Sequence, residues 1–324
     1  MNENQLICKT LRKEFSKVGW ALLAYYGIMN LAILLSSLVM GVIAGIQMVL
    51  TPGMTEEGYD RLLENVIQDA TWGYAVAVVV GAVLLLIWKK PKFCFEEIWE
   101  QKKPMTVGSF FALLAIFISG QGLFQVLTPL LEWLFGLMGI SLMDSIASAS
   151  GNTDHWAMFL YVGLLAPVWE EILFRGYVMR TLKPYGKRFA IFASAFLFGI
   201  YHGNVVQSPY AFAVGLVLGY VAMEYSMLWA MVLHMINNLL LGDTIGRLVQ
   251  DLPVQWQEIT FLVLIWGCVV AGIIVLICKR KAVAAYFKEG KMHPLCLKSF
   301  FTSPGVITLT VILFGLTTVA LFLS

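Results

Sequence analysis

The chain has 324 residues, of which 59% are hydrophobic and only 13% are charged, whereas soluble domains carry about 25% charged residues. The mean hydropathy is +0.79, which excludes an ordinary soluble domain. The formal net charge of +2 does not indicate a nucleic-acid partner, because the basic residues cluster in loops rather than on one face. We therefore expect an all-α, polytopic integral membrane bundle whose surroundings are the lipid bilayer.

Apolar segments recur along the chain, and about nine of them are expected to be transmembrane helices. A helix needs roughly 20 apolar residues to span a bilayer. We find no internal repeat, so the chain reads as a single membrane domain, 1–324. In chain order, the expected spans are residues 19–50, 72–88, 108–140, 156–182, 188–201, 210–225, 227–241, 260–278 and 306–323.

The basic residues indicate how the chain is oriented. Short cytoplasmic loops carry an excess of Lys and Arg. All but three of the 22 basic residues lie before the first span or in the loops after the second, fourth and eighth spans. These segments share one side of the membrane if nine spans alternate. We therefore expect a cell-membrane protein with a cytoplasmic N-terminus and an external C-terminus.

The fourth span contains ionisable residues at membrane depth. It reads A-P-V-W-E-E-I-L-F-R-G-Y and carries Glu170, Glu171 and Arg175. Each such group costs roughly 2.5–3.5 kcal/mol at a bilayer centre, so these side chains must face protein or a water-filled cavity. Glu171 and Arg175 are four apart and can pair, whereas Glu170 points about 100° away. The spacing therefore predicts that Glu170 is left to act as a general base or acid.

Two later spans add histidines at a similar depth. Phe198 precedes His202 by four residues, and His234 precedes Asn238 by four on one helical face. At 1.5 Å per residue, Glu170 and His234 lie about 15 Å from the cytoplasmic side and His202 about 21 Å. A carboxylate and an imidazole can activate water for attack on a carbonyl. A second imidazole and an amide can stabilise the resulting oxyanion.

Taken in order, the motifs E-E-x-x-x-R, F-x-x-x-H and H-x-x-x-N resemble the CPBP family, which contains CAAX-type prenyl-protein endopeptidases and bacteriocin-processing (ABI) proteins. The resemblance covers residues 154–248 and implies an intramembrane endopeptidase of the glutamic type. It implies that Glu170 is the catalytic carboxylate, that His202 helps it to activate water, and that His234 and Asn238 form the oxyanion site. The implied supporting residues are Glu171, Arg175 and Phe198.

The resemblance also predicts how the chain is divided and what it binds. Residues 154–248 form the CPBP-like core, and the flanking segments 1–153 and 249–324 carry no motif of their own. The resemblance implies a membrane-associated peptide or protein as substrate. No His-Glu-x-x-His pattern occurs, so we expect neither a metal nor a cofactor. The oligomeric state stays open.

Other interpretations remain. The protein could be a non-proteolytic binding protein, such as a bacteriocin self-immunity factor or a partner that modulates a membrane sensor. A proton-coupled transporter is a third possibility, since Glu–His arrays relay protons, but the chain lacks an inverted repeat.

The Glu171–Arg175 pair could be purely structural. Gly215 and Gly219 predict close helix packing, and Pro167 is expected to bend the fourth span.

Overall fold

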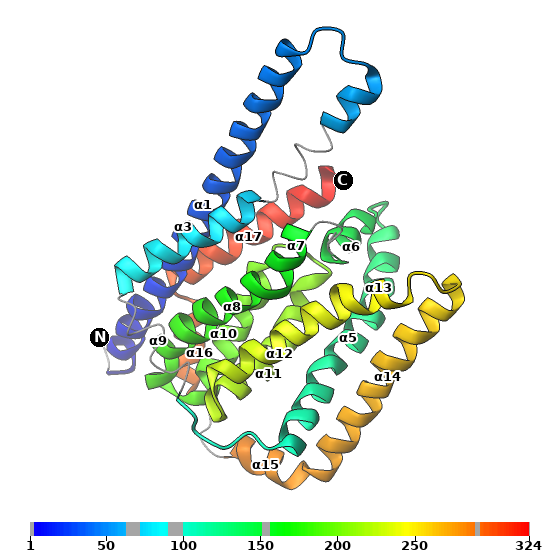
Figure 1. The fold of residues 1–324 in the computed structure, drawn as a ribbon. Helices are drawn as coiled ribbons and strands as arrows, with labels where there is room; N and C mark the ends of the chain where they lie inside the picture. The colour runs from blue at the N-terminus through cyan, green and yellow to red at the C-terminus, as the bar shows by residue number, and fades with distance from the viewer. Residues whose placement is uncertain (1–2, 63–71, 90–99, 151–155, 289–291, 324) are drawn as a thin grey trace.

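The computed structural model describes residues 3–62, 72–89, 100–150, 156–288 and 292–323. All regular structure within these residues is helical (Figure 1), which confirms the predicted all-α class. Seven of the predicted spans coincide with simple α-helices. They are α1 (Glu3–Leu50), α3 (Trp72–Lys89), α5 (Val107–Gly136), α10 (Lys187–Tyr201), α11 (Gln207–Glu224), α14 (Val254–Cys278) and α17 (Pro304–Leu323).

The fourth and seventh predicted spans are continuous helices that change hydrogen-bond register along their length. The fourth comprises α7 (Trp156–Leu160), the π-helix η1 (Tyr161–Leu165), α8 (Ala166–Glu171), the π-helix η2 (Ile172–Met179) and α9 (Arg180–Leu182). The seventh comprises α12 (Met227–Ile236), the π-helix η4 (Asn237–Thr244) and α13 (Ile245–Val249). The short helices are α6 (Met143–Ser150), the 3₁₀ turn η3 (Lys183–Tyr185), α15 (Arg280–Lys288) and α16 (Pro294–Phe301).

Five helices in the described part of the chain are long and apolar enough to cross a membrane. The others are shorter or less apolar; α10 has 15 residues and is about 22 Å long, less than the roughly 30 Å of a hydrocarbon core. The chain is therefore a multi-pass membrane protein, and the number of nine spans stays a prediction. The five helices are Glu3–Leu50, Val107–Gly136, Met227–Val249, Val254–Cys278 and Pro304–Phe322.

The helices form a central group with a flanking group on either side (Figure 1). On one side α1 packs against α3 and α17, and on the other α5 packs against α14. Between them, α10 and α11 approach closely, as the glycines of α11 predicted. A Cβ atom added to Gly215 would lie 3.3 Å from the Cα of Ala195 on α10. This close packing positions the backbone around the polar residues of the central group.

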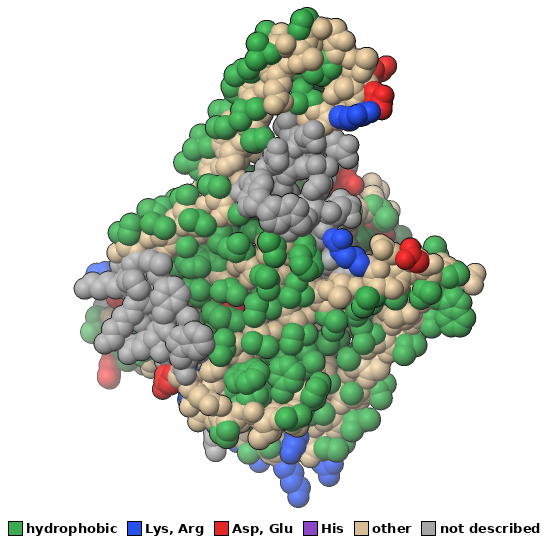
Figure 2. Space-filling model, in the orientation of Figure 1, with side chains coloured by type: hydrophobic (Ala, Val, Ile, Leu, Met, Phe, Trp, Pro, Cys, Tyr) green, Lys and Arg blue, Asp and Glu red, His purple; other side chains and the backbone are tan. Residues whose placement is uncertain are grey.

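Contacts bring several of the basic loops together at one end of the bundle. The Nζ atoms of Lys103 and Lys187 lie 2.6 Å and 3.4 Å from the two carboxylate oxygens of Glu224, at the end of α11. Arg188 donates a hydrogen bond of 2.6 Å to the carbonyl of Phe287 in α15. Figure 2 shows Lys and Arg side chains gathered at this end, below the apolar surface of the bundle.

Candidate active site

The acidic pair lies on a short α-helical stretch between two π-helical segments. Helix α8 has only six residues, and η1 and η2 adjoin it on either side. Pro167 lies in the first turn of α8, where its missing N–H group is tolerated. Such π segments occur frequently at functional sites, because they shift side chains out of α-helical register. The sequence predicted a bend at Pro167 but not the two π segments.

Glu171 lies at the centre of a buried ionic network. Its Oε1 atom accepts hydrogen bonds from Nη1 of Arg175 at 2.9 Å and from Nδ1 of His234 at 3.0 Å. The predicted Glu171–Arg175 pair is therefore confirmed. Arg175 also donates from Nη2 to the carbonyl of Gly215 at 3.0 Å. Both members of the pair are buried, so this network holds the fourth span, α11 and α12 together.

His234 lies between the two neighbouring carboxylates. Its Nδ1 atom is bonded to Glu171, and its Nε2 atom lies 3.7 Å from Oε2 of Glu170. The two carboxylates differ in accessibility, since the side chain of Glu170 is 33% exposed and that of Glu171 is 0% exposed. The geometry thus leaves Glu170 as the accessible carboxylate, on the side of the helix that the spacing predicted.

His202 occupies the end of α10, with its ring turned back onto the helix. Its Nδ1 atom lies 2.8 Å from the carbonyl oxygen of Phe198. A carbonyl only accepts hydrogen bonds, so Nδ1 carries the hydrogen and Nε2 is available to accept one. The resemblance made His202 the partner of Glu170, whereas in the structure Nε2 of His234 lies 3.7 Å from Oε2 of Glu170.

The ring of Phe198 connects the two histidines. Its centroid lies 4.7 Å from the ring of His202 and 5.9 Å from the ring of His234, both in edge-on arrangements. The guanidinium carbon of Arg175 lies over the same ring at 4.6 Å, a cation–π contact. Phe198 therefore limits the movement of three polar side chains at once.

Asn238 is anchored to the fourth span. Its Nδ2 atom donates to the carbonyl of Val162 in η1 at 2.9 Å, and its Oδ1 atom accepts from Asn237 at 3.0 Å. Oδ1 of Asn237 accepts from Gln121 and from Tyr210, each at 3.2 Å. No motif assigns a role to Asn237, Gln121 or Tyr210, which lie at the start of η4, in α5 and in α11.

Aromatic residues that no motif contains join α1 to the part of the fourth span that carries Glu170. The indole N–H of Trp169 donates a hydrogen bond to the hydroxyl of Tyr25 in α1. The hydroxyl of Tyr201 is buried and has no hydrogen-bond partner among the described residues. The ring of Tyr25 lies 6.5 Å from that of Trp169 and 6.4 Å from that of Tyr201. Two of these aromatic residues adjoin motif residues in the sequence, which was the only available signal.

No group of three or more His, Cys, Asp or Glu side chains in the described segments could hold a metal ion. The absence of a metal and of a cofactor stays a prediction.

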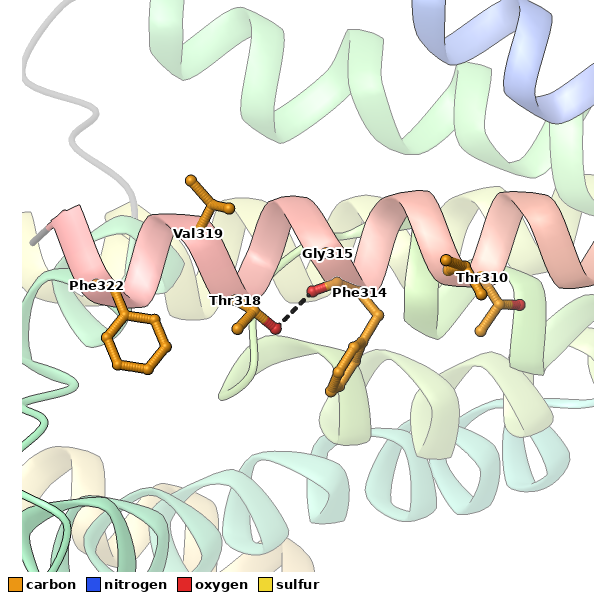
Figure 3. Close-up of a pocket in the computed structure, with 7 residues that line it drawn as sticks. Thr310, Phe314, Gly315, Thr318, Val319 and Phe322 are labelled. Carbon is orange, nitrogen blue, oxygen red and sulfur yellow. Dashed lines mark hydrogen bonds between the residues drawn. The ribbon is translucent and has the colours of Figure 1, made fainter.

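A separate apolar groove on α17 carries none of this chemistry (Figure 3). It has a volume of about 610 Å³ and is lined by residues such as Phe314, Thr318 and Phe322. The hydroxyl of Thr318 donates to the carbonyl of Phe314 at 2.8 Å, so its hydrogen bond is made within the helix. Phe314 is 72% exposed, as expected for a side chain that faces lipid.

The fold and the site together define a multi-pass helical membrane protein with carboxylates and imidazoles clustered in its interior. Residues 152–240 match the family described as type II CAAX prenyl endopeptidase Rce1-like. This match confirms the resemblance to the CPBP family over that segment, just over a quarter of the 324-residue chain. No curated protein and no solved structure matches the chain. The matched segment contains Glu170, Glu171, Arg175, Phe198, His202, His234 and Asn238.

Proposed function

We propose that this chain is an intramembrane endopeptidase that hydrolyses a peptide bond of a membrane-associated peptide or protein. The observation that carries the proposal is the contrast between adjacent carboxylates. Glu171 is fully buried and bonded to Arg175 and His234, whereas Glu170 is 33% exposed and lies 3.7 Å from Nε2 of His234. The family match, whose description is that of a prenyl endopeptidase, supports hydrolysis of a peptide bond.

In the proposed reaction, Glu170 is the general base. It takes a proton from a water molecule while the water oxygen forms a bond to the substrate carbonyl carbon. The second hydrogen stays on that oxygen and donates a hydrogen bond to Nε2 of His202, whose Nδ1–H is held by the carbonyl of Phe198. The proton on Glu170 then passes to the leaving amine nitrogen as the carbon–nitrogen bond breaks. This assignment keeps His202 as the partner of Glu170 in water activation.

Two donors are available for the oxyanion. In the proposed step His234 is the imidazolium from the outset, held against the carboxylate of Glu171; its Nδ1–H is bonded to Glu171, and its Nε2–H is available for the substrate oxygen. Asn238 has two amide hydrogens, of which the carbonyl of Val162 takes one. A donor fixed in advance at a developing negative charge contributes about 2.7–4 kcal/mol to lowering a barrier. Arg175 holds Glu171, and Glu171 holds His234, so both are positioning residues.

The proposed orientation places the N-terminus in the cytoplasm and the C-terminus outside. Its support is the gathering of Lys103, Lys187 and Arg188 at one end of the bundle, because cytoplasmic loops are basic. The test uses a chain whose native cysteines have been replaced. An impermeant thiol reagent applied to intact cells should label Thr55→Cys and leave Lys281→Cys unlabelled. The reverse pattern would overturn the orientation.

The proposed activity is tested by comparing peptides from cells that express wild type, Glu170→Gln or His202→Ala. Mass spectrometry of membrane and secreted fractions should show a cleavage product that both variants lose, with rates reduced by about 10²–10⁴-fold. The matched control is Glu258→Gln, which makes the same change at an exposed position of α14. If the peptide profiles of wild type and of both variants agree while the variants still rescue a deletion phenotype, the cluster is structural and a non-proteolytic binding function takes precedence.

A further inference from the structure

A second polar site lies at the basic end of the molecule, between the start of α1 and the segment that joins α16 to α17. It is a groove of about 1170 Å³. None of the described side chains that line it is acidic. One basic side chain, that of Lys17, pairs with Glu14 at 2.7 Å outside the groove. The basic residues that line the groove are Lys9, Arg12, Lys13, Lys17 and Lys298.

The walls of the groove are held together by tight packing. A Cβ atom added to Gly19 would lie 2.2 Å from the carbonyl carbon of Gly305, so α1 and α17 touch backbone to backbone. The N–H of Gly305 donates to the hydroxyl of Ser16 at 3.2 Å. The rings of Phe15 and Phe300 pack at 6.1 Å beneath the groove. The basic side chains therefore project from two helices whose spacing is fixed.

The charges that line the groove favour an anion. Arg12 lines it together with four lysines, and no described side chain of the lining is acidic. A guanidinium beside other cations favours an anionic partner, and its fork of N–H groups matches the oxygens of a phosphate.

The position of the groove in the membrane indicates which phosphate it holds. Helix α1 is polar before Lys17 and apolar after Gly19, and α17 is apolar from its first turn. Trp20 lies on the rim and is 48% exposed, and indole rings favour the depth of lipid headgroups. We propose that this groove binds the phosphate headgroup of an anionic phospholipid. Its volume exceeds the roughly 300–1,000 Å³ of small-molecule pockets, which leaves room for the glycerol.

A lipid held there would connect a flanking helix to the helices that carry the site. Beneath the groove, the ring of Phe15 also contacts Tyr185 at 5.0 Å and Phe189 at 5.2 Å. Tyr185 and Phe189 lie in η3 and α10, between Glu170 and His202 in the sequence. A headgroup bound to both α1 and Lys298 would hold α1 and α16 against this part of the core. The inference does not depend on the proposed proteolysis.

The test titrates the purified full chain in detergent with phosphatidylglycerol, phosphatidylcholine or glycerol 3-phosphate, and native mass spectrometry counts the bound molecules. Wild type should retain one phosphatidylglycerol. The double variant Arg12→Gln/Lys13→Gln should bind it about 30-fold more weakly, because each basic residue near an anionic headgroup contributes roughly a factor of five. Lys298→Gln, on the opposite wall, should lose about fivefold. Thermal unfolding checks that each variant is folded.

The control is Lys279→Gln/Lys281→Gln, which removes two exposed charges beside α15 at the same end of the molecule. It should keep the wild-type affinity. An equal loss in the control would mean diffuse attraction between charges and would overturn the site. Equal binding of phosphatidylcholine would exclude recognition of the net negative charge. Full competition by glycerol 3-phosphate would assign the groove to a soluble phosphate instead of a lipid.

Discussion

In the helix Met227–Val249, which carries His234, 40% of the residues in the most apolar window are buried inside the protein, whereas in Val254–Cys278, the next helix, the figure is 11%. The second helix packs against α5 on one side and leaves most of its side chains at the surface of the protein, where lipid requires apolar groups. More of the first helix is enclosed by protein, so it can hold an imidazole and two adjacent amides. The flanking helices therefore cover the central group, and this burial is what permits charge at membrane depth.

The largest expected effect is the loss of the buried ion pair in the central group. Arg175→Met leaves Glu171 buried without its cation, and should lower the free energy of unfolding by about 3–5 kcal/mol. Lys17→Met breaks the exposed pair with Glu14 in α1, and should cost less than about 1 kcal/mol. Unfolding in mixed micelles, as a denaturing detergent is titrated, measures both. Similar losses would mean that the central pair is not shielded as the structure indicates.

One contact between the flanking helices α1 and α17 should tolerate substitution as poorly as the core does. A Cβ atom at Gly305 would lie 2.2 Å from the carbonyl oxygen of Ser16, and a backbone cannot move aside cheaply. Gly305→Ala should therefore destabilise the protein by about 1–3 kcal/mol.

The control for this prediction lies on the same helix. Gly315 has nothing within 4 Å of an added Cβ atom, so Gly315→Ala should stabilise the helix by about 0.5–1 kcal/mol. Opposite shifts in the melting temperature would support the contact between α1 and α17. Shifts of the same sign would contradict it.

The hydropathy of the sequence predicted most of the lipid-facing helices. A lipid-exposed helix must be apolar over its whole length, so hydropathy located flanking helices such as α14 and α17 closely. The fourth and seventh spans were recognised instead from their motifs. The pairing of Glu171 with Arg175 was predictable because both lie on one helix at a fixed spacing.

The contacts between helices were not predictable in the same way. A π-helical turn is stabilised by its neighbours rather than by composition, so η1 and η4 left no pattern in the sequence. The bonds from Asn238 to Val162 and from His234 to Glu171 depend on those register changes and on packing. The contribution of Tyr25 depends on how α1 docks, which no local motif encodes.

A smaller effect is expected at Tyr201, where stability and activity should move in opposite directions. Its hydroxyl is buried without a partner in the described part of the chain, which costs free energy. Tyr201→Phe should therefore raise the free energy of unfolding by about 1 kcal/mol. It should also slow cleavage, if the hydroxyl serves a substrate or water beside Glu170. The control is Tyr26→Phe, because the ring of Tyr26 lies 5.5 Å from that of Tyr201. It should change neither the free energy of unfolding nor the cleavage rate. An unchanged cleavage rate in Tyr201→Phe would mean that the hydroxyl has only a structural role.

The smallest effect concerns the ion pair that joins a flanking loop to the central group. The hydrogen bond to Glu224 raises the pKa of Lys103 above its ordinary value. The folded state therefore holds this proton more tightly than the unfolded chain, in which the pKa is about 10.4. The stabilisation is complete below that pH and is lost as the pH rises through the folded-state pKa. Since the Lys103 side chain is 57% exposed, the pair contributes less than about 1 kcal/mol.

Lys103→Gln removes the titrating group while leaving Lys187 to neutralise Glu224. The melting temperature of wild type should exceed that of the variant at about pH 8, and the difference should shrink at about pH 11.5, above the pKa of an unperturbed lysine. Lys279→Gln, which changes an exposed lysine at the end of α14, should show no such convergence. A difference that stays constant with pH would mean that Lys103 packs against the end of α11 through its alkyl chain, so that shape rather than charge joins the loop to the core.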